Sequence, residues 1–233
     1  MRTVLVAEDE STIRDFIVIN LKIAGFDVIE ACNGAKAIEL YDTYSDNIDI
    51  ALLDVMMPEA TGHDVCKHIR ENNANVGVIF LTAKTQEQDI IGGFKFGADD
   101  YITKPFSPSE LVARIETLYR RVEYSKKLMK SSQNDKIRLG NFELDLKKHC
   151  VSNKGEVIEL TQIEFQVLEC FFNEPGKAID RKYILNKVWG DPYFGDDKVV
   201  DVNIRRLRLK LEECPSNPRH LITIWGQGYC WKE

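Results

Sequence analysis

The stretch Asp49–Gly62, DIALLDVMMPEATG, shows the pattern on which the first half of the chain is built. Its first six residues are an apolar run between two acids, typical of a strand buried on both faces of a sheet. A polar loop follows, and a helix is predicted from about Gly62 to Glu71. A strand, a loop and a helix in this order indicate an α/β unit, with Asp54 at the carboxyl end of its strand.

The same alternation continues on both sides of this stretch. We expect strands at Thr3–Ala7, Asp27–Glu30, Asp49–Asp54, Val76–Thr82 and Tyr101–Thr103, and helices capped by Ser11 and over Ala35–Tyr44, Gly62–Glu71, Glu87–Phe96 and Pro108–Arg121. Five strands interleaved with five helices predict a doubly wound α/β fold, a five-stranded parallel sheet covered on both faces. Functional sites in such a fold form at the carboxyl ends of the strands.

Acids stand at the ends of the first and third predicted strands, as Glu8, Asp9 and Asp54, and Lys104 follows the fifth. Carboxylates held about 4 Å apart repel one another by roughly 1–4 kcal/mol unless a cation joins them. Mg²⁺ suits such a site, because it accepts few protein oxygens and then binds phosphate oxygens. These residues therefore predict a magnesium site for phosphoryl transfer onto a carboxylate, with the Thr82 hydroxyl close enough to donate a hydrogen bond.

The character of the sequence changes in the second half. Residues Val122–Lys136 are polar and charged without an apolar stripe, which predicts a linker. From Ile137 short alternating segments predict antiparallel strands, with a turn at Asn153–Gly155. Thr161 and Glu164 form a capping box at the start of the first helix. Helices are expected at Thr161–Asn173, Arg181–Trp189 and about Lys198–Glu213, and a hairpin at Leu221–Trp231.

Composition adds a charge asymmetry. The net charge is -6, but residues 1–121 hold 12 Lys and Arg against 20 Asp and Glu, a balance of -8, whereas residues 122–233 hold 19 against 17, a balance of +2. The six cysteines form no C-x-x-C pair and indicate free thiols in a reducing cytosol. No apolar run approaches the ~18–20 residues that span a membrane, and the first residues do not read as a signal peptide. We therefore expect a cytoplasmic protein.

The acidic constellation resembles the receiver domain, and the pattern EDE…LLDVMMPEATG…LTA…GADDYITKPF extends over residues 1–121. The resemblance implies a CheY-like, flavodoxin-like fold in which Asp54 accepts a phosphoryl group from a sensor histidine kinase. It also implies that Asp9, Asp54 and the backbone carbonyl of Met56 hold Mg²⁺, with Glu8 helping through water.

Three further residues acquire roles from the same resemblance. Lys104 would pair with the acceptor carboxylate and later with the phosphoryl group, and its bond to Pro105 would be cis, a minority state for X-Pro. Thr82 and Tyr101 would form a switch pair, in which the threonine moves to the phosphoryl group and the aromatic ring turns inward.

The receiver family uses its fourth helix, fifth strand and fifth helix as a symmetric dimer surface. Asp100 with Arg114 and Asp99 with Arg121 match the family's cross-dimer pairs. One position differs from the family pattern. Relatives carry a basic residue on the fourth helix as the partner of Glu110, but Ile90 occupies that position here. The expected dimer face comprises Lys95, Asp99, Asp100, Glu110, Arg114, Glu116 and Arg121.

Residues 137–233 resemble the α+β winged helix-turn-helix domain of OmpR/PhoB-type regulators, with the basic segment KVVDVNIRRLRLK at 198–210 as its recognition helix. The resemblance implies that Arg206 reaches a base edge and that Val202 lies against a thymine methyl group. Trp225 departs from the arginine common at that position, so we expect it to pack at the base of the wing. Contacts to the DNA backbone are expected from Lys198, Asn203, Arg205, Arg208, Thr223 and Tyr229.

The combined expectation is a DNA-binding response regulator, with a receiver at 1–121, a flexible linker at 122–136 and a winged helix at 137–233. Its partners would be a histidine kinase, promoter DNA, RNA polymerase through the loop Gly190–Asp197, and a second copy of the chain when phosphorylated. It would not be a turnover enzyme. A metal-dependent phosphatase of the haloacid dehalogenase type needs D-x-D, but Met56 occupies the second position. A phosphorylation-independent regulator with a relic pocket is the remaining alternative.

Overall fold

The computed structural model describes residues 2–83, 97–128, 136–191, 193 and 197–232. The chain divides into two compact units, Met1–Val122 and Glu123–Glu233. The predicted helix Glu87–Phe96 and part of the loop Gly190–Asp197 lie outside the described residues. In the described part of the chain, no helix combines the length and the apolar character needed to span a membrane.

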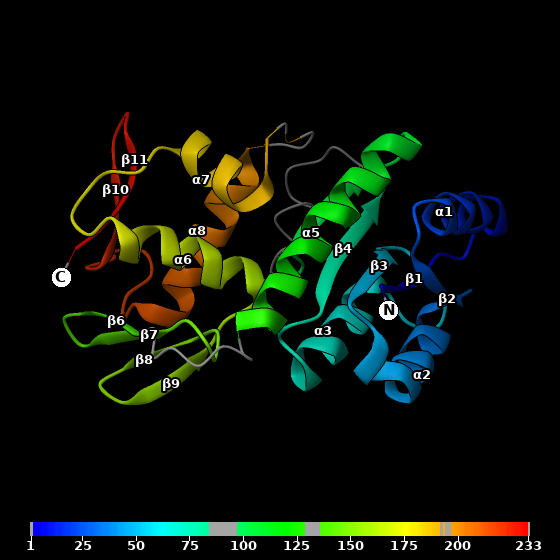
Figure 1. Ribbon diagram of the computed structural model, residues 1–233, viewed down its shortest axis with the longest axis horizontal. Helices are drawn as coiled ribbons and strands as arrows, with labels where there is room; N and C mark the ends of the chain where they lie inside the picture. The colour runs from blue at the N-terminus through cyan, green and yellow to red at the C-terminus, as the bar shows by residue number, and fades with distance from the viewer. Residues whose placement is uncertain (1, 84–96, 129–135, 192, 194–196, 233) are drawn as a thin grey trace. The chain divides into compact units, whose positions relative to one another are not determined.

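The first unit is built on a parallel sheet, as predicted (Figure 1). Its strands have the order β2-β1-β3-β4-β5. The chain therefore runs from β1 to one edge and returns past β1, so that the order reverses between β1 and β3, where ligands bind in such folds. The strands are β1 (Thr3–Ala7), β2 (Asp27–Ala31), β3 (Ile50–Asp54), β4 (Gly77–Thr82) and β5 (Asp100–Thr103).

Helices cover both faces of this sheet. On one face, a core of β-strand residues such as Val6, Leu52 and Ile79 packs against Leu21 of the first helix and Ile115 of the last. The other face packs against the second and third helices. Because both faces are covered, the middle residues of the three inner strands β1, β3 and β4 are apolar, and polar residues stand only at strand ends. The helices are α1 (Ser11–Ile23), α2 (Gly34–Tyr44), the 3-10 turn η1 (Ser45–Asn47), α3 (Gly62–Asn72) and α5 (Pro108–Leu128).

The start of α1 and the end of α5 differ from the sequence prediction. Ser11 is the first residue of α1 rather than its cap, and Glu10 occupies the cap position without a side-chain hydrogen bond. Helix α5 continues past Arg121 to Leu128, into the segment predicted as linker. Val122 is buried and extends the apolar stripe of Ile115 and Leu118, and the Glu, Lys and Leu residues that follow favour a helix. Residues 129–135 of the predicted linker lie outside the described ranges.

Among its described residues, the second unit contains a four-stranded antiparallel sheet, three helices and a terminal hairpin. Lys154 and Gly155 connect two strands and both have positive φ, as a two-residue hairpin turn requires. The strands are β6 (Lys136–Leu139), β7 (Phe142–Asp145), β8 (Cys150–Asn153), β9 (Glu156–Glu159), β10 (Leu221–Ile224) and β11 (Gly228–Trp231), and the helices are α6 (Gln162–Asn173), α7 (Arg181–Trp189) and α8 (Lys198–Leu211).

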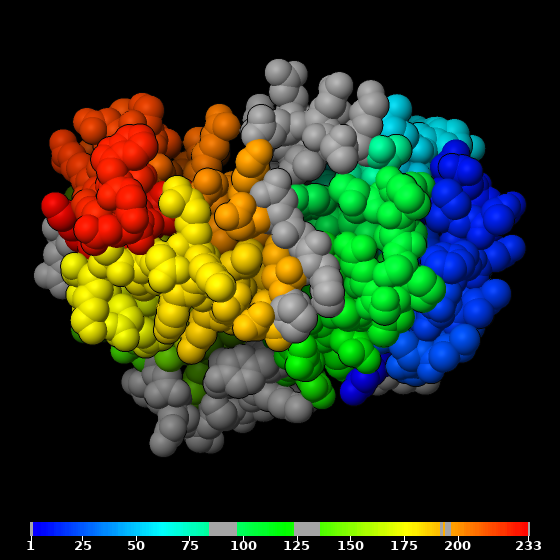
Figure 2. Space-filling model, turned by 90° about the horizontal axis from the view of Figure 1, so that it is seen from above, coloured from blue at the N-terminus to red at the C-terminus, as the bar shows by residue number. Residues whose placement is uncertain are grey.

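Trp231 is the centre of packing in this unit. Its buried ring meets Phe142 of β7 edge-on at 5.1 Å and Phe172 of α6 at 5.0 Å, so the hairpin is joined to the sheet and to a helix. The predicted capping box is present, because Thr161 and Glu164 exchange side-chain to backbone hydrogen bonds. The hairpin, red in Figure 2, lies on the surface of the unit.

Candidate functional site

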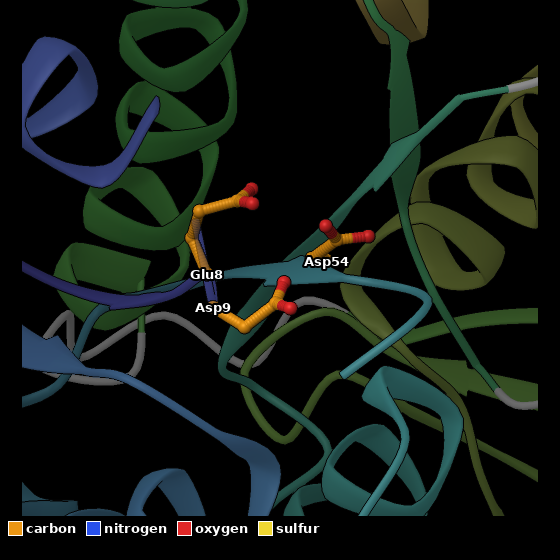
Figure 3. A group of neighbouring side chains, drawn as sticks. All are labelled: Glu8, Asp9 and Asp54. Carbon is orange, nitrogen blue, oxygen red and sulfur yellow. The ribbon is translucent and has the colours of Figure 1, made fainter. Parts of the chain in front are cut away.

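Three carboxylates meet at the point where the strand order of the first unit reverses. Glu8 and Asp9 follow β1, and Asp54 ends β3 (Figure 3). One oxygen from each lies within 4.8 Å of the others. Glu8 and Asp54 are buried, whereas Asp9 is exposed, so the cluster is open to solvent at Asp9. The structure thus brings together the three acids that the strand-end argument selected.

Lys104 reaches the same pocket from the end of β5. Its ammonium donates to Oδ2 of Asp54 at 2.6 Å and to Oε1 of Glu8 at 2.9 Å. Burial by itself lowers the pKa of a lysine, but the two hydrogen bonds outweigh it and raise the pKa of Lys104. The lysine is therefore charged at neutral pH and holds the side chain of Asp54 in place.

Glu8 is the most perturbed acid of the pocket. Burial raises its pKa to about 7, with a further contribution from the nearby Asp54, and the hydrogen bond from Lys104 offsets only part of this rise. When all three acids are ionised, one lysine faces three carboxylates, and negative charge remains uncompensated. Hard carboxylate oxygens in this number suit a divalent cation such as Mg²⁺.

Backbone contacts fix the phosphoacceptor candidate. The N–H of Met56 donates to Oδ1 of Asp54 at 3.1 Å. Gly62, at the start of α3, lies so close to the carbonyl of Asp54 that an added Cβ would be 2.2 Å from its oxygen. On the far side, the N–H of Lys104 donates to the carbonyl of Thr82 at 2.7 Å, and the Lys104–Pro105 bond is cis as expected. The ends of β3, β4 and β5 are thus held together around one carboxylate.

The expected switch pair lies on the neighbouring strands β4 and β5. Thr82 ends β4, and Tyr101 lies on β5 opposite Phe80 of β4. The Tyr101 side chain is buried, and Thr82 is partly exposed. Tyr101 therefore already occupies a buried position in this structure.

Residues of the expected dimer face bond within the chain. Arg114 donates to both carboxylate oxygens of Asp100, at 3.0 and 3.2 Å, and also to Glu110 at 3.0 Å. Asp99 is fully buried, where it accepts hydrogen bonds from Arg70 at 2.8 Å and from the N–H of Val78 at 2.7 Å. Glu116 is exposed and Arg121 partly exposed, while Lys95 and Ile90 lie outside the described residues.

In the second unit, α8 divides the predicted DNA contacts between two faces. Lys198 and Arg205 are exposed and Val202 is partly exposed, at a helical spacing that gives one surface. Asn203 is fully buried and Arg206 is 7% exposed, with its guanidinium donating to the side-chain oxygen of Asn203 at 3.3 Å. In this structure α8 turns Asn203 and Arg206 into the protein, so the expected contacts of Arg206 with a base edge and of Asn203 with a phosphate stay predictions.

The other predicted contacts gather where the hairpin meets α8. Arg208 donates to the carbonyl of Leu221 at 2.8 Å and to the hydroxyl of Thr223 at 2.9 Å. Tyr229 is buried, and its hydroxyl donates to Asp201 at 2.6 Å. Sequence reasoning assigned no role to Asp201, although it is the only acid in the basic segment 198–210, and that isolation was the available signal.

Trp225 is 91% exposed, so the expectation that it packs at the base of the wing is wrong. It follows the last residue of β10, at the turn of the hairpin, where the chain reverses before Gly228. A side chain at such a tip has no neighbouring layer against which it could pack.

A buried acid and lysine pocket at the switch point of a doubly wound sheet, followed by three helices and a hairpin, defines a receiver joined to a DNA-binding domain. Comparison with known families agrees. Residues 4–116 match the response regulator receiver domain, and residues 155–231 match the C-terminal domain of transcriptional regulatory proteins. The chain belongs to the response regulators of two-component systems, in the OmpR/PhoB group.

Full-length relatives support this assignment. A probable transcriptional regulator, ycf27 of Cyanidium caldarium, is 40% identical over 97% of this chain and 92% of its own length. The sensory transduction protein RegX3 of Mycolicibacterium smegmatis is 38% identical over 98% of both. Among solved structures, DrrB of Thermotoga maritima, an OmpR/PhoB homologue, covers both chains fully at 31% identity and a TM-score of 0.50. A RitR mutant with a TM-score of 0.79 but 24% identity shares the fold. Membership implies a histidine kinase partner and binding to DNA.

Proposed function

We propose that the chain is a transcription regulator whose DNA binding is controlled by phosphorylation of Asp54. The observation that carries this proposal is the contact between Lys104 and Asp54, within a pocket that also holds Glu8 and Asp9. Burying Asp54 beside two further acids is unfavourable, so an acid with no function would be expected on the surface instead. An acceptor carboxylate needs this arrangement, because the incoming phosphoryl group brings about two negative charges that must be balanced.

In the proposed reaction, a carboxylate oxygen of Asp54 attacks the phosphorus of a phosphorylated histidine or a small acyl phosphate. A new O–P bond forms, the bond from phosphorus to the donor breaks, and the electron pair leaves with the donor. Glu8, Asp9, Asp54 and the carbonyl of Met56 would hold Mg²⁺, which when bound neutralises charge on the transferred group.

The positions of the other side chains suit the same reaction. Lys104 is bonded to Asp54 before transfer, and it can follow the charge onto a phosphoryl oxygen. Thr82 ends β4, and its hydroxyl would donate a hydrogen bond to the phosphoryl group. The chain itself loses the phosphoryl group by hydrolysis and turns over no external substrate, so we propose a switch and not an enzyme.

Phosphorylation would act on DNA binding through a shift of populations. We propose that it favours a receiver state that dimerises through the face formed by α5 and β5, so that two second units bind adjacent half-sites. Because Asp100, Arg114 and Glu110 bond within the chain, dimer formation would exchange or extend existing ion pairs. RNA polymerase would be contacted through the loop Gly190–Asp197.

The test is the intact mass of the full chain after incubation with acetyl phosphate, with and without Mg²⁺. We expect a Mg²⁺-dependent gain of one phosphoryl group that is absent from Asp54→Asn. Asp46→Asn, which removes an exposed acid of the same unit, is the matched control and should label fully. Full labelling of Asp54→Asn would show that the acceptor lies elsewhere.

A further inference from the structure

Arg14, in the first turn of α1, bonds back to the segment that carries two acids of the pocket. Its guanidinium nitrogen Nη1 donates to the backbone carbonyl of Glu8 at 2.7 Å and to that of Asp9 at 3.4 Å. These two residues join the end of β1 to Glu10, which occupies the cap position of α1. One side chain of the helix therefore holds the backbone on which both acids stand.

This contact matters more for Asp9 than for Glu8. Glu8 is fully buried, and its N–H donates to the carbonyl of Ala31 at 3.2 Å, so the sheet already fixes it. Asp9 is exposed, and Glu10 caps α1 without a side-chain hydrogen bond. The direction of the Asp9 carboxylate, which is turned toward Asp54 in Figure 3, thus depends on how the backbone at Asp9 is held.

The positive charge of Arg14 is unexpected beside a cation site. A guanidinium repels a divalent cation, so its removal alone should tighten the binding of Mg²⁺. Its presence favours metal binding only if it holds the ligands in a geometry that the cation requires. Mg²⁺ is demanding in this respect, because it binds oxygens at short distances and in a nearly octahedral arrangement.

We propose that Arg14 is a positioning residue that holds the backbone of Glu8 and Asp9, so that the Asp9 carboxylate meets a divalent cation together with Asp54. The inference rests on the proposed magnesium site and adds a residue outside the ligand set that controls its affinity. Outer groups that orient metal ligands change the affinity by about 10- to 100-fold when they are removed. Because Arg14 orients one ligand through its backbone, we expect an effect at the lower end of this range.

Arg14→Met should raise the dissociation constant for Mg²⁺ by about tenfold, although it removes a positive charge. Methionine keeps an apolar stem and removes every N–H donor. Arg14→Lys keeps the charge but has a single donor nitrogen, so its dissociation constant should lie between those of Arg14→Met and the unmodified chain. An effect of charge alone would instead leave Arg14→Lys normal and tighten binding by Arg14→Met.

Lys22→Met is the matched control. Lys22 lies on the same helix, has a side chain that is 57% exposed, and pairs with Glu30 of β2 at 3.6 Å. Its replacement removes the same charge from the same helix without touching the segment that carries the acids. The dissociation constant for Mg²⁺ should therefore stay that of the unmodified chain.

Isothermal titration calorimetry of the full chain with Mg²⁺ measures these constants, after circular dichroism has shown that each variant is folded. If Arg14→Met binds Mg²⁺ as tightly as Lys22→Met, or more tightly, the positioning role is overturned while the magnesium site stands. If Arg14→Met does not fold, Arg14→Lys decides, and normal binding by that variant overturns the role. If the unmodified chain binds no Mg²⁺, the proposed site fails and the positioning role fails with it.

The rate of labelling of Asp54 by acetyl phosphate is the second measurement. In Arg14→Met, the Mg²⁺ concentration that gives half of the maximal rate should rise by the same factor as the dissociation constant, and the maximal rate should change less. A purely structural role would lower the maximal rate and leave that concentration unchanged, which would contradict the proposal. Absence of labelling in the unmodified chain would overturn the proposed function itself.

Discussion

The ammonium of Lys104 lies 2.6 Å from Oδ2 of Asp54 and 2.8 Å from Oε2 of Glu8, so one cation contacts two buried carboxylates. The three side chains are at most 14% exposed. Their charges therefore interact in a medium that screens poorly. Adding or removing a charge in this pocket should therefore change the free energy of unfolding of the chain.

Lys104→Met should destabilise the chain in the absence of Mg²⁺ and leave it close to normal in its presence. Removing one partner of a buried pair costs about 3–5 kcal/mol, because the remaining charges are uncompensated. A divalent cation can supply the missing charge. Calorimetric scans with and without Mg²⁺ measure this, with Lys67→Met, at an exposed pair, as control. An equal Mg²⁺ effect on both variants would contradict the prediction.

Mild acid should weaken the second unit through His149. Its imidazole is buried and meets the ring of Phe165 edge-on at 4.6 Å. Burial lowers the pKa of His149 below its ordinary value of 6.5, and the charge of Asp145 offsets only part of this. Below about pH 6.5 the unfolded chain binds a proton that the folded chain does not, so the free energy of unfolding falls with pH by at most about 1.4 kcal/mol per unit.

Urea denaturation of the chain at several pH values between 7.5 and 5.5, followed through the unfolding transition of the second unit, measures how its free energy of unfolding depends on pH. The comparison is with His149→Phe, which keeps an aromatic ring and cannot titrate. We expect the pH dependence of the variant to be smaller. Parallel curves for the two proteins would assign the acid sensitivity to other groups.

Gly62→Ala should disturb the pocket although the residue carries no functional group. The new Cβ would meet the carbonyl oxygen of Asp54 at 2.2 Å and its carbon at 3.0 Å, and backbone atoms cannot move aside cheaply. We expect a loss of about 1–3 kcal/mol in the free energy of unfolding and a lower rate of labelling by acetyl phosphate. Gly25→Ala is the comparison: its φ of +84° strains an alanine, but its Cβ meets open space, so labelling should stay normal.

Arg205→Ala and Arg206→Ala should differ in kind. Arg205 is exposed, so its loss should weaken binding to every duplex, reduce the salt slope by about one, and leave the melting temperature unchanged. Arg206 is buried against Asn203, so its loss should lower the melting temperature. If Arg206→Ala is as stable as the unmodified chain and binds with a relaxed base preference, the prediction is contradicted and Arg206 contacts a base.

Periodicity predicted the elements well, because burial on one or both faces leaves a repeat that can be counted. The pocket was also predictable, since parallel strands place Asp9, Asp54 and Lys104 at one edge once the fold is known. The directions in which the side chains of α8 point could not be predicted from the sequence. Arg206 and Arg205 are adjacent in a basic helix, and which of them faces inward depends on the packing of α6. Arg70 likewise reads as a solvated charge, yet it bonds the buried Asp99.

The exposure of Trp225 gives this protein an optical property of its own. The chain has three tryptophans, and the other two, Trp189 and Trp231, are buried. Only the indole of Trp225 therefore fluoresces in a solvent-exposed environment, and a soluble quencher such as acrylamide should quench its emission before that of the two buried indoles. Any partner that approaches the hairpin tip will change this component of the fluorescence without a label, while the two interior rings report whether the fold is intact.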